Sequence, residues 1–455
     1  MVRIHDTALG RLTDLQTREP GKVSMYVCGP TVYDVAHLGH GRHLLVFDVM
    51  RRYLAWAGYE VRYVSNVTDI EDKIIAKANA AGISPDEVVA TYEAQWWSLV
   101  ERLGCRRPDE TPHATAYVDQ MIAFIGELVD RGRAYVTDDG VYFSVESLEG
   151  YGLLARQSLE SMRAGGGDRD IVGEEGKRHP ADFALWKAAK PGEPAWDSPW
   201  QAGRPGWHIE CTVMALDLLG EGFDLHGGGH DLAFPHHENE RAQAVGAGRV
   251  FATHWVHHGM VLAAGGEEMH RSAGNFVTLA DLLEKHDARA YRLLVLQSHY
   301  RGPMEVNDDN IGAAERTLAG LDNFAQRVAV DLGPDLPEPD PGVLERFRRE
   351  MDEDFNTPPA MAVVFDAVRQ ANTALDRGDA GAAGPLAAAA LALVTMVGLP
   401  PKASDEIDQE SADMAARRDE CRAARDYAGA DAIRAQLEAL GWTVRDTPGG
   451  TRLSR

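Results

Sequence analysis

The chain has 455 residues, enough for about three domains, and a formal net charge of −24. Its hydrophobic fraction of 44% excludes wholesale disorder, and without an apolar run of about 18 residues a membrane-spanning helix is not expected. The acidic balance argues against a protein that coats nucleic acid by charge alone. Only four cysteines occur and the N-terminus is not apolar, so we expect a cytoplasmic protein without disulfides.

The first part of the chain predicts a parallel α/β sheet. Residues 23–28 and 61–64 are short runs typical of strands, and residues 44–56 carry apolar side chains at helical spacing between them. A strand, a helix and a second strand in succession favour a βαβ unit. Further elements are predicted as helices within 75–103 and at 117–132, and as a hairpin at 134–145 around Asp138-Asp139-Gly140.

The second half predicts mainly helices. A glycine-rich polar stretch at 163–180 predicts a surface loop. Alanine-rich helical patterns at 310–330 and 341–396 predict a helical bundle. Residues 397–410 predict a linker, after which 411–455 begin with a charged helix and end near a strand-like segment.

A loop with two histidines follows the first predicted strand. His37 and His40 flank Leu38 and Gly39 just before the predicted helix. At the N-terminus of a helix in such a sheet, free N–H groups and the helix dipole attract anions. The imidazoles could donate hydrogen bonds to phosphate oxygens there, although the pattern alone fits an unrelated structural role equally well.

A second set of residues has the chemistry of metal ligands. His236 and Glu240 follow Pro235, which suits the first position of a helix, and at i and i+4 they would share one face while Glu238 points elsewhere. With the thiolates of Cys28 and Cys211 they would complete a tetrahedral zinc site. The spacing leaves an alternative open, in which both cysteines are buried apolar residues and His236 caps a helix.

Two glycine-containing segments lie further along the chain. Gly227, Gly228 and Gly229 follow an apolar strand end, which indicates either close approach of the backbone to a flat or phosphorylated group or a plain turn. His230 comes next and is expected to face solvent. Residues 265–275, whose one cation is Arg271, are by themselves typical of a surface loop.

Together these segments resemble the cysteinyl-tRNA synthetases, a family of class I aminoacyl-tRNA synthetases. The histidine loop is similar to the HIGH signature of that class, and residues 265–275 are similar to its KMSKS loop. Further segments similar to family motifs are Tyr26–Asp34, Asn66–Lys73, Phe183–Lys187, Gly206–Cys211, Phe234–Glu240, Asp354–Pro358 and Ala430–Arg434. The resemblance covers essentially the whole chain.

The resemblance implies roles for these residues. One zinc ion per chain would be held by Cys28, Cys211, His236 and Glu240, and would bind the substrate thiolate. This matters because cysteine and serine differ by one atom, whereas a soft thiolate on zinc is strongly preferred over a hydroxyl. Residues expected around the cysteine are Cys28, Thr68, Trp207 and His226. ATP would bind together with Mg²⁺. The catalytic residues at ATP would be His37, His40 and Arg271. The other residues expected to contact ATP are Gly227, Gly228, Gly229 and Asp231.

The resemblance also implies an architecture. A Rossmann-type class I synthetase catalytic domain would span 1–310, with an insertion at about 110–200. A helical bundle at 311–397 and a small mixed anticodon-binding domain at 405–455 would follow. The implied partners are tRNA, cysteine and ATP, and nothing demands more than a monomer. Candidate RNA contacts are Arg417, Arg418, Arg422, Arg425, Trp442 and Arg445, although a solvated helix face and a core tryptophan are simpler interpretations.

One departure from the family pattern stands out. Where the family usually has Lys-Met-Ser-Lys-Ser, this chain has Glu268-Met269-His270-Arg271-Ser272. Arg271 keeps a cation at the second lysine, but Glu268 reverses the charge at the first. Arginine and lysine are not interchangeable at phosphate sites. We therefore predict slower amino-acid activation than in a relative with two lysines.

Three functional hypotheses follow. The first is a cysteine–tRNA ligase. The second is a ligase with the same activation chemistry but another acceptor, such as an amino sugar, and the C-terminal segment 411–455 argues against it. The third, motivated by the altered loop, is a catalytically weak or non-catalytic paralogue, which the intact His37, His40 and zinc candidates argue against.

Overall fold

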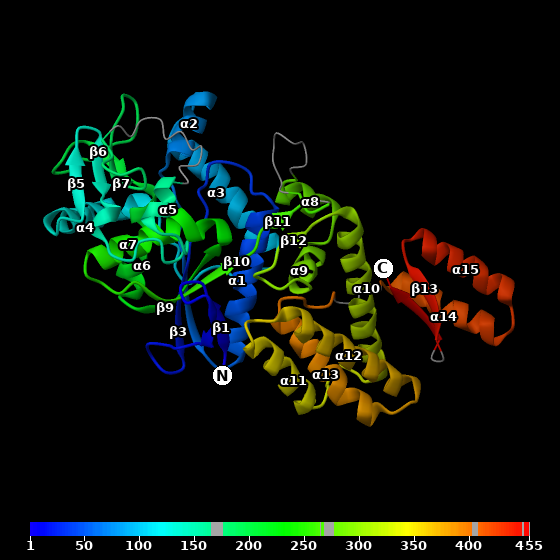
Figure 1. The fold of residues 1–455 in the computed structure, drawn as a ribbon. Coiled ribbons are helices and arrows are strands. Elements are labelled where there is room, and N and C mark those ends of the chain that lie inside the picture. The colour runs from blue at the N-terminus through cyan, green and yellow to red at the C-terminus, as the bar shows by residue number, and fades with distance from the viewer. Residues whose placement is uncertain (165–175, 264, 268–276, 403–407, 448–449, 455) are drawn as a thin grey trace.

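The structure is a computed structural model, and it describes all residues except 165–175, 264, 268–276, 403–407, 448–449 and 455 (Figure 1). At its centre lies a parallel sheet with the strand order β10 (Ala252–His258), β9 (Phe223–Gly229), β3 (Lys22–Val27) and β4 (Glu60–Ser65). Met25 of β3 pairs with Leu225 on one side and Tyr63 on the other. The predicted βαβ unit and parallel sheet are confirmed.

The strand order places a switch point between β3 and β9. From β3 the chain proceeds to β4 on one side, and it returns much later to add β9 on the other side. Ligands of open α/β sheets bind beyond the carboxyl ends of the strands at such a point. The segments that follow Val27 and Gly229 are therefore the ones placed to form a site.

Helix α1 (Leu38–Trp56) connects β3 to β4 and begins earlier than residue 44, where the apolar spacing placed it. The reason is a cap: the backbone N–H of His37 donates to Nδ1 of His40 (3.2 Å). The stretch 75–103 forms two helices, α2 (Asp72–Ala81) and α3 (Pro85–Arg102). Gly82, at φ 67°, ends α2 in the left-handed conformation that favours glycine.

A second, antiparallel sheet lies in the stretch between β4 and β9. Its strands are, in order, β5 (Ala134–Thr137), β6 (Gly140–Phe143), β7 (Phe183–Ala188) and β8 (Gly203–Pro205). The predicted hairpin is confirmed, with Thr137 opposite Gly140. Helix α4 (Val118–Asp130) buries Met121, Phe124 and Ile125 in the same core, and α5 (Leu159–Ala164) follows the hairpin.

The chain after the parallel sheet is largely helical. It comprises α8 (Leu279–Lys285), α9 (Ala288–Leu296), α10 (Asp308–Asp331), α11 (Pro341–Asp352), α12 (Thr357–Asp376) and α13 (Ala380–Met396). Alanines of α12 and α13 are buried, so these two helices pack closely. The helices share one hydrophobic cluster with α1 and β3, so the predicted bundle is packed on the sheet unit. Two further pairs of short strands lie outside the two sheets. β1 (Arg3–Asp6) and β2 (Arg11–Asp14) form an antiparallel hairpin before β3, and β11 (Val261–Leu262) pairs in parallel with β12 (Met304–Glu305).

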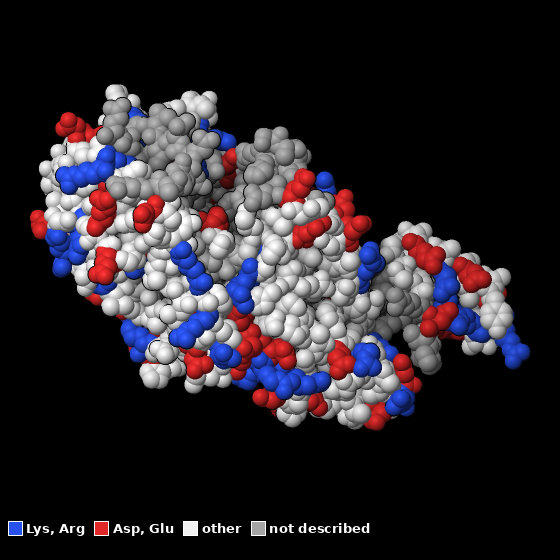
Figure 2. All heavy atoms as spheres, in the orientation of Figure 1, with Lys and Arg blue, Asp and Glu red and all other residues white. Residues whose placement is uncertain are grey.

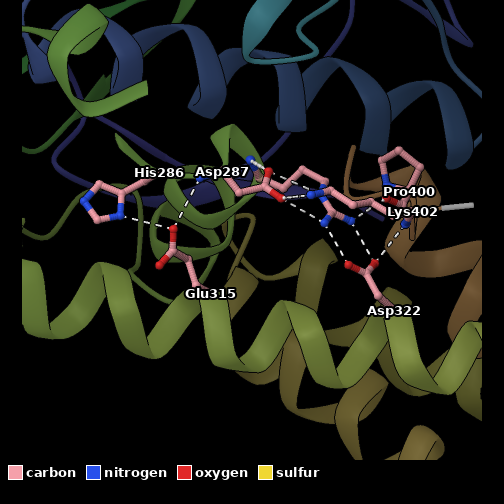
Figure 3. A network of polar contacts seen from close by, with 7 residues as sticks. His286, Asp287, Glu315, Asp322, Pro400 and Lys402 are labelled. Atoms are coloured by element: carbon pink, nitrogen blue, oxygen red, sulfur yellow. Dashed lines mark hydrogen bonds and ion pairs between the residues drawn. The ribbon is translucent and has the colours of Figure 1, made fainter. Parts of the chain in front are cut away.

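Two arginines of α9 make polar junctions across this packing. Arg292, almost wholly buried, donates to Asp48 of α1 (2.6 Å) and to the carbonyl of Val397 (3.2 Å). Arg289 donates one hydrogen bond to each carboxylate oxygen of Asp322 on α10, both at 2.8 Å. Asp322 is labelled in the network of Figure 3. Asp322 also accepts the backbone N–H of Lys402 (2.8 Å), so one network joins α9, α10 and the segment after α13.

The C-terminal part forms a small unit that stands apart from the sheet in Figure 1. It contains α14 (Gln409–Ala423), α15 (Tyr427–Ala439) and a hairpin of β13 (Thr443–Thr447) with β14 (Gly450–Ser454). Trp442 lies in its core and donates to Ser411 (2.8 Å).

This packing confirms the simpler interpretation for part of the candidate RNA-contact set, a core tryptophan included. Trp442 and Arg418 are each 2% exposed, and Arg418 donates to Asp446 (2.7 Å), so neither is free for RNA. Arg422 also pairs with Asp446, whereas Arg417 and Arg425 are exposed. The side chain of Arg445 lies outside the described part of the chain.

The face of the molecule drawn in Figure 2 carries charges of both signs. Basic and acidic side chains are interspersed there. Among the described residues, no helix combines the length and apolarity that crossing a membrane requires.

Candidate metal and amino-acid site

The four predicted metal ligands meet at the switch point of the sheet. Cys28 follows β3, Cys211 lies in α6 (Trp207–Leu219), His236 in the turn Ala233–His237, and Glu240 in α7 (Glu238–Gly246). All four are buried, and their ligand atoms lie within 4.8 Å of one another. Nε2 of His236 is 3.1 Å from Oε1 of Glu240, and Sγ of Cys28 is 3.5 Å from the same oxygen.

The local backbone agrees with the one predicted. The helix α7 is assigned from Glu238, but within the preceding turn Ala233–His237 only Phe234 is non-helical (φ −143°, ψ 133°), so helical backbone runs from Pro235 into α7. His236 and Glu240 still face each other across this junction. Glu238 points elsewhere, as predicted: it accepts the backbone N–H of Leu154 (2.6 Å).

The chemistry of this donor set fits a soft divalent cation. Burial, reinforced by Cys211 and Glu240, holds the pKa of the Cys28 thiol well above its ordinary value. Burial holds the pKa of His236 well below its ordinary value, so this imidazole is neutral and does not balance the carboxylate. A cation shared by the four groups would supply the missing charge, and two thiolates, an imidazole and a carboxylate suit tetrahedral zinc.

Two further histidines adjoin the four ligands. Nε2 of His226, on β9, is 3.0 Å from Oε2 of Glu240. His237 contacts His257 through ring nitrogens 2.8 Å apart. Together with Cys28 and Glu240, these two imidazoles make a second group of four possible ligands. The first group contains both thiolates and is the better match to the preference of zinc for sulfur.

The residues predicted around the amino acid lie against these ligands. The indole of Trp207, 36% exposed, stacks on the ring of His236 with centroids 4.2 Å apart. The hydroxyl of Thr68 donates to Glu210 (2.9 Å) and accepts from the side chain of Asn66 (3.3 Å). Neither Asn66 nor Glu210 was identified as a site residue from the sequence. For Glu210, its place directly before Cys211 in a mainly apolar helix was an available signal.

The histidine loop lies at the start of α1. The rings of His37 and His40 stack with centroids 3.8 Å apart, and burial and the neighbouring His37 hold the pKa of His40 well below its ordinary value. His37 bridges to Thr278, just beyond the segment similar to KMSKS. Arg271 itself lies outside the described residues.

The glycine run has a packing explanation within the protein. A Cβ at Gly227 would lie 2.4 Å from the ring of Phe47, and one at Gly228 would lie 2.7 Å from the ring of His237. Side chains of the chain itself occupy these positions, so close packing alone requires both glycines. His230 and Asp231 are exposed, which confirms the expectation for His230.

The fold and the comparisons define the class. Residues 14–316 match the family model described as the tRNA synthetases class I (C) catalytic domain, and residues 346–399 match that of the DALR domain. A solved Mycobacterium tuberculosis methionyl-tRNA synthetase bound by methionyl-adenylate is similar in fold, with a TM-score of 0.63 and 16% identity over 83% of this chain and 92% of that one. The chain is therefore a class I aminoacyl-tRNA synthetase by fold.

Full-length relatives specify the family. A cysteine–tRNA ligase of Halorhodospira halophila is 45% identical over 466 residues, and one of Alkalilimnicola ehrlichii is 46% identical over 470 residues. Each alignment covers 100% of both chains. The chain belongs to the cysteine–tRNA ligase family.

Proposed function

We propose that this protein is a cysteine–tRNA ligase that activates cysteine with ATP and transfers it to the 3′ end of tRNA. The observation that carries the proposal is the buried group of Cys28, Cys211, His236 and Glu240 at the switch point of a class I sheet. Full-length relatives named cysteine–tRNA ligase support the same reaction. No comparison favours an amino-sugar acceptor.

The four ligands would hold one zinc ion. When bound, zinc supplies a soft Lewis acid that prefers a thiolate to a hydroxyl and so separates cysteine from serine. Trp207, stacked on His236, would cover the bound amino acid, and Thr68 and His226 would border it. Cys28 would be both a ligand and part of the wall of the amino-acid pocket.

His37 and His40, at the N-terminus of α1, would bind ATP phosphates, where helix N–H groups favour negative charge. Gly227, Gly228, Gly229 and Asp231, at the end of β9, would border the adenine and ribose. Arg271 would stabilise the leaving pyrophosphate, with Mg²⁺ bound to ATP. The substrate carboxylate attacks the α-phosphate and releases pyrophosphate, and the 3′-terminal ribose hydroxyl of tRNA then attacks the activated carbonyl and releases AMP. Such reactions depend mainly on positioning and charge stabilisation.

The acceptor would be a tRNA with the GCA anticodon, read by the C-terminal unit 405–455. Arg417 and Arg425 are the exposed members of the predicted contact set there. We expect the protein to be a monomer in the cytoplasm. Its catalytic unit would span residues 1–310 and its helical unit residues 311–397.

The test is aminoacylation with zinc-replete protein, ATP, labelled cysteine and this tRNA. We expect cysteine to be charged and serine to be rejected. Absence of charging, with cysteine-dependent pyrophosphate exchange retained, would favour another acceptor; absence of both would favour a non-catalytic paralogue.

The metal is tested with a matched pair of variants. Cys211→Ser should lose the bound zinc measured by elemental analysis, whereas Cys421→Ser, in α14 and away from the sheet, should keep one zinc ion per chain. Equal zinc content in both variants would contradict the ligand assignment.

A further inference from the structure

A buried carboxyl group adjoins the ligand cluster without belonging to it. Glu210 precedes Cys211 in α6, and its side chain is completely buried. Its Oε2 accepts a hydrogen bond from the hydroxyl of Thr68 (2.9 Å). Its Oε1 has no hydrogen-bond partner among the described residues, although a buried polar atom is costly unless it is satisfied. A carboxyl group retained at this position therefore indicates a functional role.

Asn66 makes the second hydrogen bond to the hydroxyl of Thr68. Its side-chain carbonyl accepts the backbone N–H of Gly29 (2.9 Å), the residue after Cys28. Its side-chain amide then donates to Thr68 (3.3 Å). The amide orientation is therefore determined by the backbone at the end of β3, and Asn66 links Thr68 to the segment that carries Cys28.

These two contacts determine what the Thr68 hydroxyl can offer. A hydroxyl has one hydrogen and two lone pairs. The hydrogen is directed to Glu210 and one lone pair receives the Asn66 amide, so only a second lone pair remains. Thr68 can thus accept a hydrogen bond from a ligand but cannot donate one. Of the polar groups of an amino acid, the ammonium is a donor and the carboxylate is an acceptor.

We propose that Glu210 is a positioning residue that fixes Thr68 as the hydrogen-bond acceptor for the ammonium group of the amino-acid substrate. The inference rests on the proposed function, which places cysteine beside Thr68. It adds that recognition of the amino group depends on a carboxylate that acts through Thr68. Thiol selection by the metal ligands and ammonium selection by this pair are then separate determinants of specificity.

The test compares cysteine with 3-mercaptopropionate, which keeps the thiol and the carboxylate but lacks the ammonium group. Dissociation constants of both ligands are measured by calorimetry on zinc-loaded protein for Thr68→Val, Thr68→Ser and Glu210→Leu. A charge-assisted hydrogen bond of this kind corresponds to about a tenfold or larger change in affinity.

We expect Thr68→Val and Glu210→Leu, which removes the acceptor oxygen, to weaken cysteine binding about tenfold and 3-mercaptopropionate binding less than about twofold. Thr68→Ser keeps the hydroxyl and should restore the wild-type ratio of the two constants. The double variant Thr68→Val with Glu210→Leu should be no weaker than Thr68→Val alone, because Glu210 acts through Thr68. Glu238→Leu, which replaces a buried acid that contacts Leu154, is the matched control and should leave the ratio unchanged.

Equal weakening of both ligands would overturn the proposal, since that is the result of a general structural role. Additive losses in the double variant would overturn it as well. If Glu210→Leu does not fold, the ratio of the two dissociation constants in Thr68→Val decides alone, and an unchanged ratio refutes the acceptor role. Failure of the wild-type zinc protein to bind cysteine would refute the proposed function itself, which separates the two failures.

Discussion

The Asp48–Arg292 pair is the junction on which the packing of α9 against α1 should depend most strongly. Both side chains are nearly inaccessible, at 2% and 1% exposed, and their charged atoms are 2.6 Å apart. Asp48 also accepts from Arg52 (2.7 Å) and from the backbone N–H of Arg106 (2.9 Å). We therefore consider Asp48→Asn, which preserves the shape of the side chain and removes its charge.

The expected cost follows from what remains around Arg292. Breaking a buried ion pair by neutralising one partner typically costs about 3–5 kcal/mol. The guanidinium keeps the carbonyls of Leu103 (3.0 Å) and Val397 (3.2 Å), which favours the lower end of that range. We expect a loss of about 3 kcal/mol in the free energy of unfolding, or roughly 6–12 °C in the first thermal transition.

The assay is thermal unfolding at neutral pH, with Asp366→Asn as the control. Asp366 pairs with Arg369 on the exposed side of α12, where such a pair is worth about 1 kcal/mol or less. A change in Asp48→Asn no larger than in the control would refute the reasoning. Burial raises the pKa of Asp48, but Arg292 and Arg52 outweigh it and hold that pKa below its ordinary value. The stabilisation is therefore complete above about pH 4, the unfolded-state value, and is lost as the pH falls through the folded-state pKa.

Three further predictions concern the loop, the metal and the α9 junction. Glu268→Lys combined with Arg271→Lys should raise the rate of cysteine-dependent pyrophosphate exchange by about 10–1,000-fold, and an unchanged rate would contradict the role given to this loop. Chelation of zinc should abolish cysteine charging, and added zinc should restore it in wild type but not in Cys211→Ser. Arg289→Lys should lower stability by about 1 kcal/mol in urea unfolding, because lysine cannot reproduce the two-pronged contact; no change would show that the contact is dispensable. Burial raises the pKa of Asp287, but Arg289 and Lys402 lower it to about 2, so its contribution should persist until the pH falls below about 4 and then decline toward pH 2.

The sequence predicted the parts of the fold whose signal is local. The runs at 23–28 and 61–64, with apolar helical spacing between them, were sufficient for the βαβ unit, and the turn at Asp138-Asp139-Gly140 was sufficient for its hairpin. Element boundaries depended on individual side chains. The early start of α1 depends on His40 accepting from the backbone of His37, a contact that apolar periodicity cannot detect.

The composition of the site could be predicted only in part. Cys28, Cys211, His236 and Glu240 were grouped from ligand chemistry and family resemblance, and the structure brings them together. The roles of Asn66 and Glu210 could not be predicted, since they depend on the distance between side chains from different elements. The glycines at 227 and 228 are a different case. The sequence indicated a close approach of some group to the backbone there, and in the structure the side chains of Phe47 and His237 are the groups that approach it.

The four ligand residues come from segments that are far apart in the chain. Cys28 and Glu240 are 212 positions apart, and the entire antiparallel sheet is synthesised between them. A growing chain therefore carries the first thiol long before α6 and α7 can dock against β3. Because metal binding of this kind is coupled to folding, zinc retention would report tertiary assembly. A substitution remote from the ligands that loosens the docking of α6 or α7 would then first be detected as loss of metal.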